Sequence, residues 1–317
     1  MTIAIDLMGG DHAPQNILKG ALDAYNERSV DLVFVGDEKT IKAELDKAGS
    51  KVDIPLCHAA EYVGMGEEAA YTLKRKPDSS IVKAFKLVEE GKAKAVVSAG
   101  NSGATVASAF HTLGNIGAIR RAALISHYPT EVGKGVLLDM GANVDCDEEN
   151  LCQFAYMGSA YAKVVFGISK PSIGLLSNGE EDVKGTRAVK GAHSILSKDK
   201  EINYFGFLEA SLLFKGKVDV VVCDGFVGNI VLKSSEALAG AILRKMGQSK
   251  DLKGHLANFD HTEYGGALLL GLNGISILCH GNSSPKEVKN AIFSAQKFLD
   301  IDFLKKFELE YKKIIGL

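Results

Sequence analysis

Short apolar runs alternate with longer amphipathic segments along nearly the whole chain. Apolar, β-branched runs predict strands at 2–5, 30–36, 52–57, 95–97, 122–127, 134–138, 172–176, 218–223 and 274–278. Segments with apolar residues three and four positions apart predict helices at 15–25, 38–48, 81–90, 105–113, 148–166, 186–196, from the loop at 224–229 to about 245, and after 285. This alternation is typical of an α/β fold built on a mostly parallel, doubly wound sheet.

Loops of one composition follow six of the predicted strands. They are built from Gly, Asn, Ser and Asp, and they begin at Asp6, Ser98, Asp139, Ser177, Asp224 and Cys279. Right-handed crossovers would bring these loops together at the carboxyl edge of a parallel sheet, where ligands bind. The loops lead into helix N-termini, whose N–H groups and dipole attract anions. We therefore expect an anion site, for phosphate, beside a wider cleft for a second substrate.

The first loop runs from Asp6 to Pro14 and reads DLMGGDHAP. Gly9 and Gly10 would let the backbone approach a phosphate without an intervening Cβ, although two glycines also simply make a tight turn. Lys184 stands just before a predicted helix, where a cation opposes the helix dipole. Either the three acidic residues before it or a bound anion explains this lysine, and we favour the anion.

Composition limits the classes of function. The chain has 317 residues, 46% of them apolar, and a net charge of −2, so no basic field indicates a nucleic acid as partner. Its five cysteines lack metal-binding spacing, and we interpret them as buried, reduced thiols of a cytosolic protein. Neither a secretory leader nor a membrane span is expected. The expected organisation is a single domain over 1–317, with a mobile excursion at about 247–263.

Two motif matches are interpreted as coincidence. The stretch 64–69, GMGEEA, imitates a dinucleotide fingerprint but does not directly follow a strand. The loop at Ser102 resembles a nucleophile elbow without its G-x-S-x-G spacing, so we interpret Ser102 as a phosphate ligand or a helix cap. The absence of a P-loop argues against an NTPase, and the absence of a convincing fingerprint argues against a dehydrogenase.

Seven motifs together carry a resemblance to a known family. They are DLMGGDHAP at 6–14, SAGNSGA at 98–104, DMGANVD at 139–145, GLLSNGEEDVKG at 174–185, FGFLE at 205–209, DVVVCDGFVGNIVLK at 219–233 and YGGALLLG at 264–271. They span nearly the whole chain in order. The chain thus resembles the bacterial acyl-ACP:phosphate acyltransferase (PlsX) family of phospholipid synthesis.

The resemblance implies a fold, a reaction and partners. The implied fold is a three-layer α/β/α sandwich related to phosphotransacetylases and decarboxylating dehydrogenases such as isocitrate dehydrogenase, in a homodimer. In the implied reaction, inorganic phosphate attacks the thioester of a long-chain acyl-acyl carrier protein, which yields acyl phosphate and free carrier protein. A membrane glycerol-3-phosphate acyltransferase then uses the acyl phosphate. No cofactor or metal is implied.

This chemistry assigns roles to the loop residues, because phosphate is already an anionic nucleophile and needs only to be held and aligned. We expect the groups that bind phosphate and the oxyanion to be Gly9, Gly10, Asn101, Ser102 and Lys184. Further residues expected to bind phosphate or the acyl thioester are Asp11, Gly103, Gly179 and Gly228, together with the orienting donors Asn143, Asn178 and Asn229. His12 is the candidate acid for the leaving thiolate. A capping role for His12 is an equal alternative. Asp6, Asp139 and Asp224 are expected to accept loop N–H bonds instead of binding phosphate.

Carrier proteins are acidic, which predicts a basic docking surface. The candidates are Lys74, Arg75, Lys76, Arg120 and Arg121. Family members can carry an amphipathic hairpin proposed to contact the membrane, whereas 248–261 here is short and polar, so the expected location is the cytoplasm, with peripheral membrane contact left open. Three alternatives remain: a phosphotransacetylase-type enzyme that uses acyl-CoA, an NAD-dependent decarboxylating dehydrogenase, and a non-catalytic scaffold for lipid enzymes.

Overall fold

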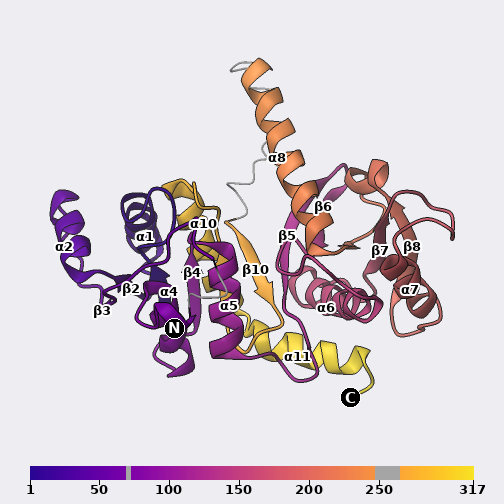
Figure 1. Cartoon of the computed structure of the whole chain (residues 1–317), viewed down its shortest axis with the longest axis horizontal. Helices are drawn as coiled ribbons and strands as arrows, with labels where there is room; N and C mark the ends of the chain where they lie inside the picture. The colour runs from indigo at the N-terminus through magenta and orange to yellow at the C-terminus, as the bar shows by residue number, and fades with distance from the viewer. Residues whose placement is uncertain (69–72, 247–264) are drawn as a thin grey trace. The chain divides into compact units, whose positions relative to one another are not determined.

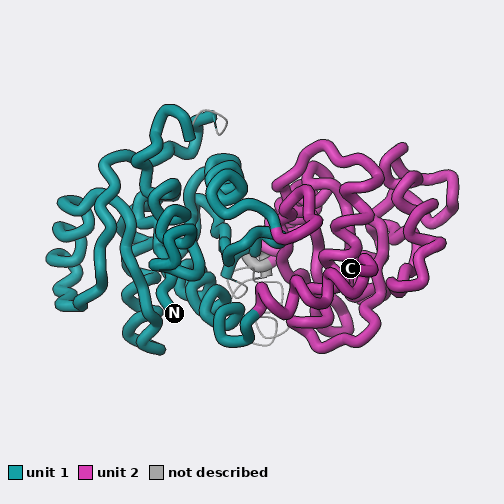
Figure 2. Tube along the Cα trace, turned by 90° about the horizontal axis from the view of Figure 1, so that it is seen from below, with its two compact units in different colours: residues 1–115, 262–302 teal, residues 116–261, 303–317 magenta. Residues whose placement is uncertain are grey.

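The computed structural model describes residues 1–68, 73–246 and 265–317. They divide into two compact units, of which unit 1 comprises Met1–Asn115 with Thr262–Asp302, and unit 2 comprises Ile116–His261 with Phe303–Leu317 (Figure 2). The expectation of one domain over 1–317 stays a prediction. The expected excursion at about 247–263 lies outside the described residues.

Unit 1 contains a six-stranded part of the sheet in the order β3-β2-β1-β4-β11-β10 (Figure 1). The strands are β1 Ile3–Asp6, β2 Leu32–Gly36, β3 Leu56–His58, β4 Ala95–Ser98, β10 Ala267–Leu270 and β11 Ile275–Leu278. All neighbouring pairs are parallel except β10 with β11. β1 and β4 are buried along their whole length, as their continuous apolar sequence predicts for strands covered on both faces.

Helices follow the strands of unit 1 and cover its part of the sheet. They are α1 Gln15–Arg28, α2 Glu38–Lys47, α4 Ser80–Glu89, α5 Ser102–Leu113 and α10 Pro285–Asp300. α1 packs on α10, and α4 packs on α5. Right-handed crossovers from β1 to β2 and from β3 to β4 run in opposite directions across the sheet and therefore place α1 and α4 on opposite faces.

Unit 2 contains strands in the order β5-β6-β9-β7-β8. They are β5 Ala123–Thr130, β6 Gly133–Leu138, β7 Ser172–Ser177, β8 Asn203–Glu209 and β9 Val220–Val222. β5 is antiparallel to β6, and the other pairs are parallel. The remaining elements are helices α6 Glu148–Phe166, α7 Arg187–Leu196, α8 Gly225–Met246 and α11 Phe303–Ile314, and the 3-10 helix η1 Ala210–Lys215. The prediction of an α/β fold with a mostly parallel sheet is confirmed.

Candidate functional site

In unit 1, three of the six predicted loops converge. They follow β1, β4 and β11, which are adjacent parallel strands, so their carboxyl ends lie side by side. A methyl group at Gly9 would lie 2.8 Å from the Gly100 Cα atom, and the Asp11 N–H donates to the Gly281 carbonyl at 2.7 Å. Gly10 has a φ of +116°, and a methyl there would lie 3.1 Å from the Ala99 carbonyl oxygen. The glycines are therefore needed for this close approach of three loops.

The side chain of Asp6 links the loop after β1 to the end of β4. Its buried carboxylate accepts hydrogen bonds from Ser98 Oγ at 2.8 Å and from the Met8 N–H at 3.3 Å. Burial raises the pKa of Asp6 above its ordinary value, and the hydrogen bonds oppose that rise. The expectation that Asp6 fixes loop geometry is confirmed, because both bonds go to neighbouring loop groups.

The N-terminus of α5 is the anion-attracting end in this cluster. Asn101 is its N-cap residue and accepts the Ala104 N–H at 3.0 Å, while Ser102 and Gly103 in the first turn are exposed. The first turn holds no acidic residue. N–H groups of a first turn have no acceptor within the helix, so those of Ser102 and Gly103 point towards solvent or a ligand.

Asn101 has a second set of contacts that its sequence position did not predict. Its Nδ2 atom donates to the carbonyls of Glu67 at 2.9 Å, Met65 at 3.0 Å and Gly64 at 3.4 Å. The 64–67 turn is therefore fastened to the start of α5.

His12 and Asp11 are both exposed, and the His12 carbonyl accepts the Asn16 N–H at 3.0 Å at the start of α1.

Unit 2 gathers the other three loops in the same way, after β6, β9 and β7, which are also adjacent and parallel. Asp139 is fully buried at the end of β6. It accepts N–H bonds from Leu124, Gly141, Ala142 and Asn143 at 2.7–3.1 Å, and from Asn143 Nδ2 at 2.8 Å. Burial raises the pKa of Asp139, and these donors oppose the rise. Asp139 thus organises its own loop, as expected.

The polar groups of Asn143 and Asp224 are also used within unit 2. The Asn143 amide donates to the Ala122 carbonyl at 2.8 Å as well as to Asp139. Asp224 accepts the Val227 N–H at 2.8 Å at the start of α8. Asn229 lies one turn into α8, close enough that a methyl at Gly141 would be 3.6 Å from its Cβ atom. The proposed contacts of Asn143 and Asn229 with substrate stay predictions.

Gly228 marks the closest approach between α8 and the loop after β6. A methyl at this position would lie 3.1 Å from Cys223 Sγ and would overlap the Asp139 carbonyl oxygen. We expect Gly228→Ala to lower the free energy of unfolding by about 2 kcal/mol, because α8 must move away from a backbone atom that cannot yield. Urea unfolding measures this effect. Gly66→Ala is the control, because a methyl there meets nothing within 4 Å, and an equal loss in both variants would contradict the packing argument.

The third loop of unit 2 carries Lys184. Asn178 Oδ1 accepts the Gly185 N–H at 2.8 Å and closes the loop. A methyl at Gly179 would lie 2.9 Å from Lys184 Cγ, so the missing side chain leaves room for the lysine stem. Thr186 caps α7, and the first turn holds Arg187 and no acidic residue. Arg187 was not among the candidates predicted from the sequence. Its positive charge at the first position of α7 opposes the helix dipole, as the charge of Lys184 does.

The proposed basic docking residues have varied surroundings. Lys76 Nζ pairs with Glu67 at 2.6 Å, and Arg120 pairs with Glu149. Arg121 donates to the Asp145 carbonyl at 3.0 Å, while Lys74 and Arg75 are exposed. The docking assignment stays a prediction.

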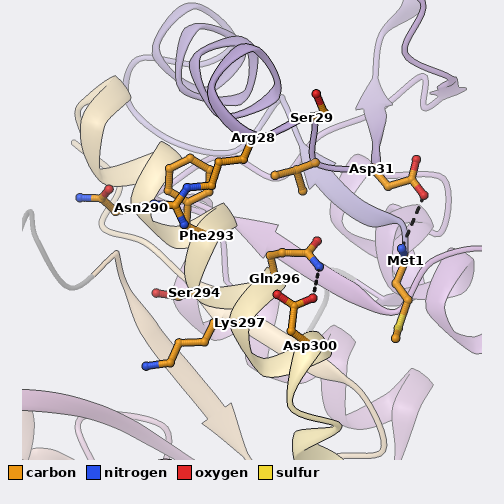
Figure 3. Close-up of a pocket in the computed structure, with 11 residues that line it drawn as sticks. Met1, Arg28, Ser29, Asp31, Asn290, Phe293, Ser294, Gln296, Lys297 and Asp300 are labelled. Carbon is orange, nitrogen blue, oxygen red and sulfur yellow. Dashed lines mark hydrogen bonds and ion pairs between the residues drawn. The ribbon is translucent and has the colours of Figure 1, made fainter.

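Unit 1 also contains a wide pocket of about 750 Å³, which Figure 3 shows with its lining residues. Met1 and Asp31, at the amino ends of β1 and β2, contribute to its lining, so it opens at the opposite edge from the carboxyl-end loops. Its other features are the Arg28 guanidinium, 3.9 Å from the centre of the Phe293 ring, and a Gln296–Asp300 hydrogen bond.

A much smaller cavity of about 10 Å³, room for one water molecule, lies at the loop cluster of unit 1 between Gly9, Val63 and Asn101.

The family model for the fatty acid synthesis protein matches residues 1–306. The chain belongs to this family. Curated relatives carry the name phosphate acyltransferase, among them proteins of Pelotomaculum thermopropionicum at 48% identity over 95% of this chain and 92% of the relative. A protein of Geobacter sulfurreducens with the same name is 45% identical over 94% and 91% of the two chains. Family membership makes this protein an enzyme of the acyltransferase class.

Solved structures support the fold assignment. A phosphotransacetylase from Streptococcus pyogenes superposes with a TM-score of 0.66 at 19% identity, over 95% of this chain and 94% of that one. A branched-chain phosphotransacylase from Enterococcus faecalis gives a TM-score of 0.60 at 17% identity, over 94% and 98%. At these identities the likeness concerns the fold alone. Among the residues that the structure describes, none of the helices has the length and apolar character to cross a membrane.

Proposed function

We propose that this protein transfers the acyl group of a long-chain acyl-acyl carrier protein to inorganic phosphate. The products would be an acyl phosphate and the free carrier protein, an early step of phospholipid synthesis that supplies a membrane glycerol-3-phosphate acyltransferase. The coarser activity, acyl transfer to phosphate, follows from the family. The carrier-protein donor and the pathway are our proposals.

One observation carries the proposal for phosphate. The helices α5 and α7 both begin at glycine-rich loops with neutral caps and no acidic residue in the first turn. Helices α1, α4, α8 and α11 likewise have no acidic residue in the first turn, whereas α2, α6 and α10 each hold a glutamate there, which offsets the positive end of the dipole. Lys184 and Arg187 add positive charge beside α7. An anionic ligand would supply the missing compensation at these two helix ends.

The chemistry needs few protein groups. Each unit offers one candidate group of donors. In unit 2, Lys184 and the N–H groups at the start of α7 would hold phosphate and remove part of its hydration. In unit 1, the N–H groups of Ser102 and Gly103 with the Gly9–Gly10 backbone are a second candidate group for an anion, and a donor that faces the oxyanion of an acyl transfer is worth about 3 kcal/mol. In the reaction, a phosphate oxygen bonds to the thioester carbon, the carbon–sulfur bond breaks, and the thiolate takes a proton from an acid such as His12 or from water.

We also propose that the enzyme is a cytoplasmic homodimer. An apolar stripe on α8 supports the dimer, because Phe226, Ile230, Leu238 and Ile242 are four, eight and four residues apart and are exposed by 57%, 48%, 63% and 37%. A second copy of this helix would cover such a stripe. Light scattering measures the mass, and a monomer at assay concentration would contradict this part of the proposal.

The decisive assay traps the product. Palmitoyl-acyl carrier protein is incubated with the enzyme, with and without inorganic phosphate, and hydroxylamine converts any acyl phosphate into a hydroxamate. We expect a phosphate-dependent hydroxamate, and a parallel reaction with palmitoyl-CoA shows which donor is preferred. Phosphate-dependent product from the CoA ester alone would replace the carrier-protein assignment. The lack of product from either donor, with the folded enzyme, would contradict the transferase activity and favour the scaffold alternative.

A further inference from the structure

The 64–67 turn in unit 1 is held from two sides by side chains distant in sequence. From one side, Asn101 uses its two amide hydrogens on the Met65 and Glu67 carbonyls at 3.0 and 2.9 Å. From the other side, Lys76 Nζ donates to Glu67 Oε1 at 2.6 Å and to the Tyr62 carbonyl at 2.9 Å. The same Glu67 oxygen accepts the Gly64 N–H at 2.7 Å and so closes the turn.

These contacts place the turn at the loop cluster. Asn101 begins α5, and a methyl at Gly281, in the loop after β11, would collide with the Met65 side-chain methyl and lie 3.2 Å from Asp11 Oδ2. The turn thus borders the loops after β1, β4 and β11. The pKa of Glu67 is lowered, first by its hydrogen bond from Lys76, so Glu67 is a carboxylate at neutral pH and the pair stays formed.

Two large side chains with apolar surface, one in the turn and one just before it, are partly exposed. Met65 is 39% exposed and Tyr62 is 54% exposed. A thioether side chain is flexible and polarisable, and it adapts to apolar ligands of different shape. The cavity lined by Val63, Gly9 and Asn101 has room for only one water molecule, so an acyl chain would lie on the exposed surface at Met65 and not in that cavity.

We propose that Asn101 is a positioning residue, and that with the Lys76–Glu67 pair it holds the 64–67 turn so that Met65 presents an apolar surface to the acyl chain of the donor. This inference rests on the proposed function, because a donor with a long acyl chain is part of that proposal. The inference changes two earlier assignments. Asn101 acts through the turn and not on phosphate, and Lys76 binds Glu67 and not the carrier protein.

Asn101→Asp tests the positioning role with little damage to the helix. Aspartate still caps the Ala104 N–H, but it has no hydrogens for the turn and places a carboxylate against carbonyl oxygens. We expect amide exchange over 61–68 to become about tenfold faster, the KM for palmitoyl-acyl carrier protein to rise about fivefold, and the KM for phosphate to change less than about twofold. A fall in kcat is also expected, because the new carboxylate offsets the dipole at the start of α5. Met65→Ala should raise the same KM without faster exchange.

Two further variants make the comparison specific. Lys76→Met removes the contacts that hold the turn from its other side. In the double variant with Asn101→Asp, the increases in exchange rate and in donor KM should therefore be little larger than in either single variant. Asn273→Asp is the matched control, because Asn273 Nδ2 likewise donates to two carbonyls, of Leu113 and Asn115, at 3.2 and 2.9 Å, away from the turn. This control should leave both exchange over 61–68 and the donor KM at wild-type values.

The outcomes separate this inference from the proposed function. A collapse of kcat in Asn101→Asp with unchanged exchange over 61–68 would overturn the positioning role and return Asn101 to the substrate. Faster exchange with an unchanged donor KM would overturn the contact between Met65 and the acyl chain. If the wild-type enzyme forms no hydroxamate, the proposed function fails, while the exchange comparison still decides whether Asn101 holds the turn.

Discussion

Lys184→Ala is expected to lower kcat/KM for phosphate about a hundredfold, which corresponds to about 2.8 kcal/mol. A charge-assisted hydrogen bond to an anion contributes about this much where solvent is partly excluded. The lysine stem crosses Gly179, and Asn178 closes the loop behind it through the Gly185 N–H, so the ammonium is held on a defined loop. Initial rates at varied phosphate measure the effect.

Two further variants test whether the loss of kcat/KM comes from the positive charge of Lys184. Lys184→Arg keeps the positive charge and should recover part of the loss, whereas Lys198→Ala removes an exposed lysine after α7 and should leave kcat/KM within about twofold of wild type. Equal losses in Lys184→Ala and Lys198→Ala would mean that the rate responds to overall charge. A loss confined to the acyl donor's KM would place Lys184 on that substrate and not on phosphate.

Asp139→Asn should lower the free energy of unfolding by about 3 kcal/mol. The substitution preserves shape, but only one oxygen remains for five N–H donors. The new amide nitrogen would face groups that themselves donate, such as the Asn143 N–H, now 2.7 Å from Asp139 Oδ2. Urea denaturation with an unchanged m-value would show that the loss is one of stability alone.

The neighbouring carboxylate Asp145 provides the control. It is exposed at the end of the same loop, and its backbone carbonyl accepts a hydrogen bond from Arg121. Asp145→Asn should change stability by less than about 0.5 kcal/mol. If Asp139→Asn were equally mild, the five donors would have other acceptors within reach, and the role of Asp139 in organising the loop would be wrong.

Periodicity predicted most elements of the fold because their burial follows the sequence pattern. The predicted helix at 148–166 coincides with α6, whose start is fixed by a capping box between Asp147 and Asn150. Other elements lacked such signals. β8 is exposed or half-buried up to Gly206 and then has two consecutive buried residues, so it shows neither a continuous apolar run nor a regular alternation, and β10 is only four residues long. The chain after Pro285 forms two helices, since a break at 301–302 includes Asp302 with a φ of +51°.

The candidate site was predictable at the level of loops but not of individual contacts. Composition alone placed polar loops after the strands, and the strand order of each unit brings three of them together. The partners of Asn101 could not be predicted, because they lie 34 to 37 residues earlier in a turn that has no strand or helix pattern. The partners of Asn143 could not be predicted either, because its amide donates to a buried carboxylate and to a backbone carbonyl that the sequence pattern does not identify.

The division of unit 1 into two sequence segments has a consequence for synthesis of the chain on the ribosome. β4 ends at Ser98, yet its second neighbour in the sheet, β11, begins only at Ile275. While the intervening residues are being translated, the apolar strand β4 has an open edge able to pair with another nascent chain. Completion of unit 1 must therefore wait until most of unit 2 has been made, so the order of translation does not match the order of assembly.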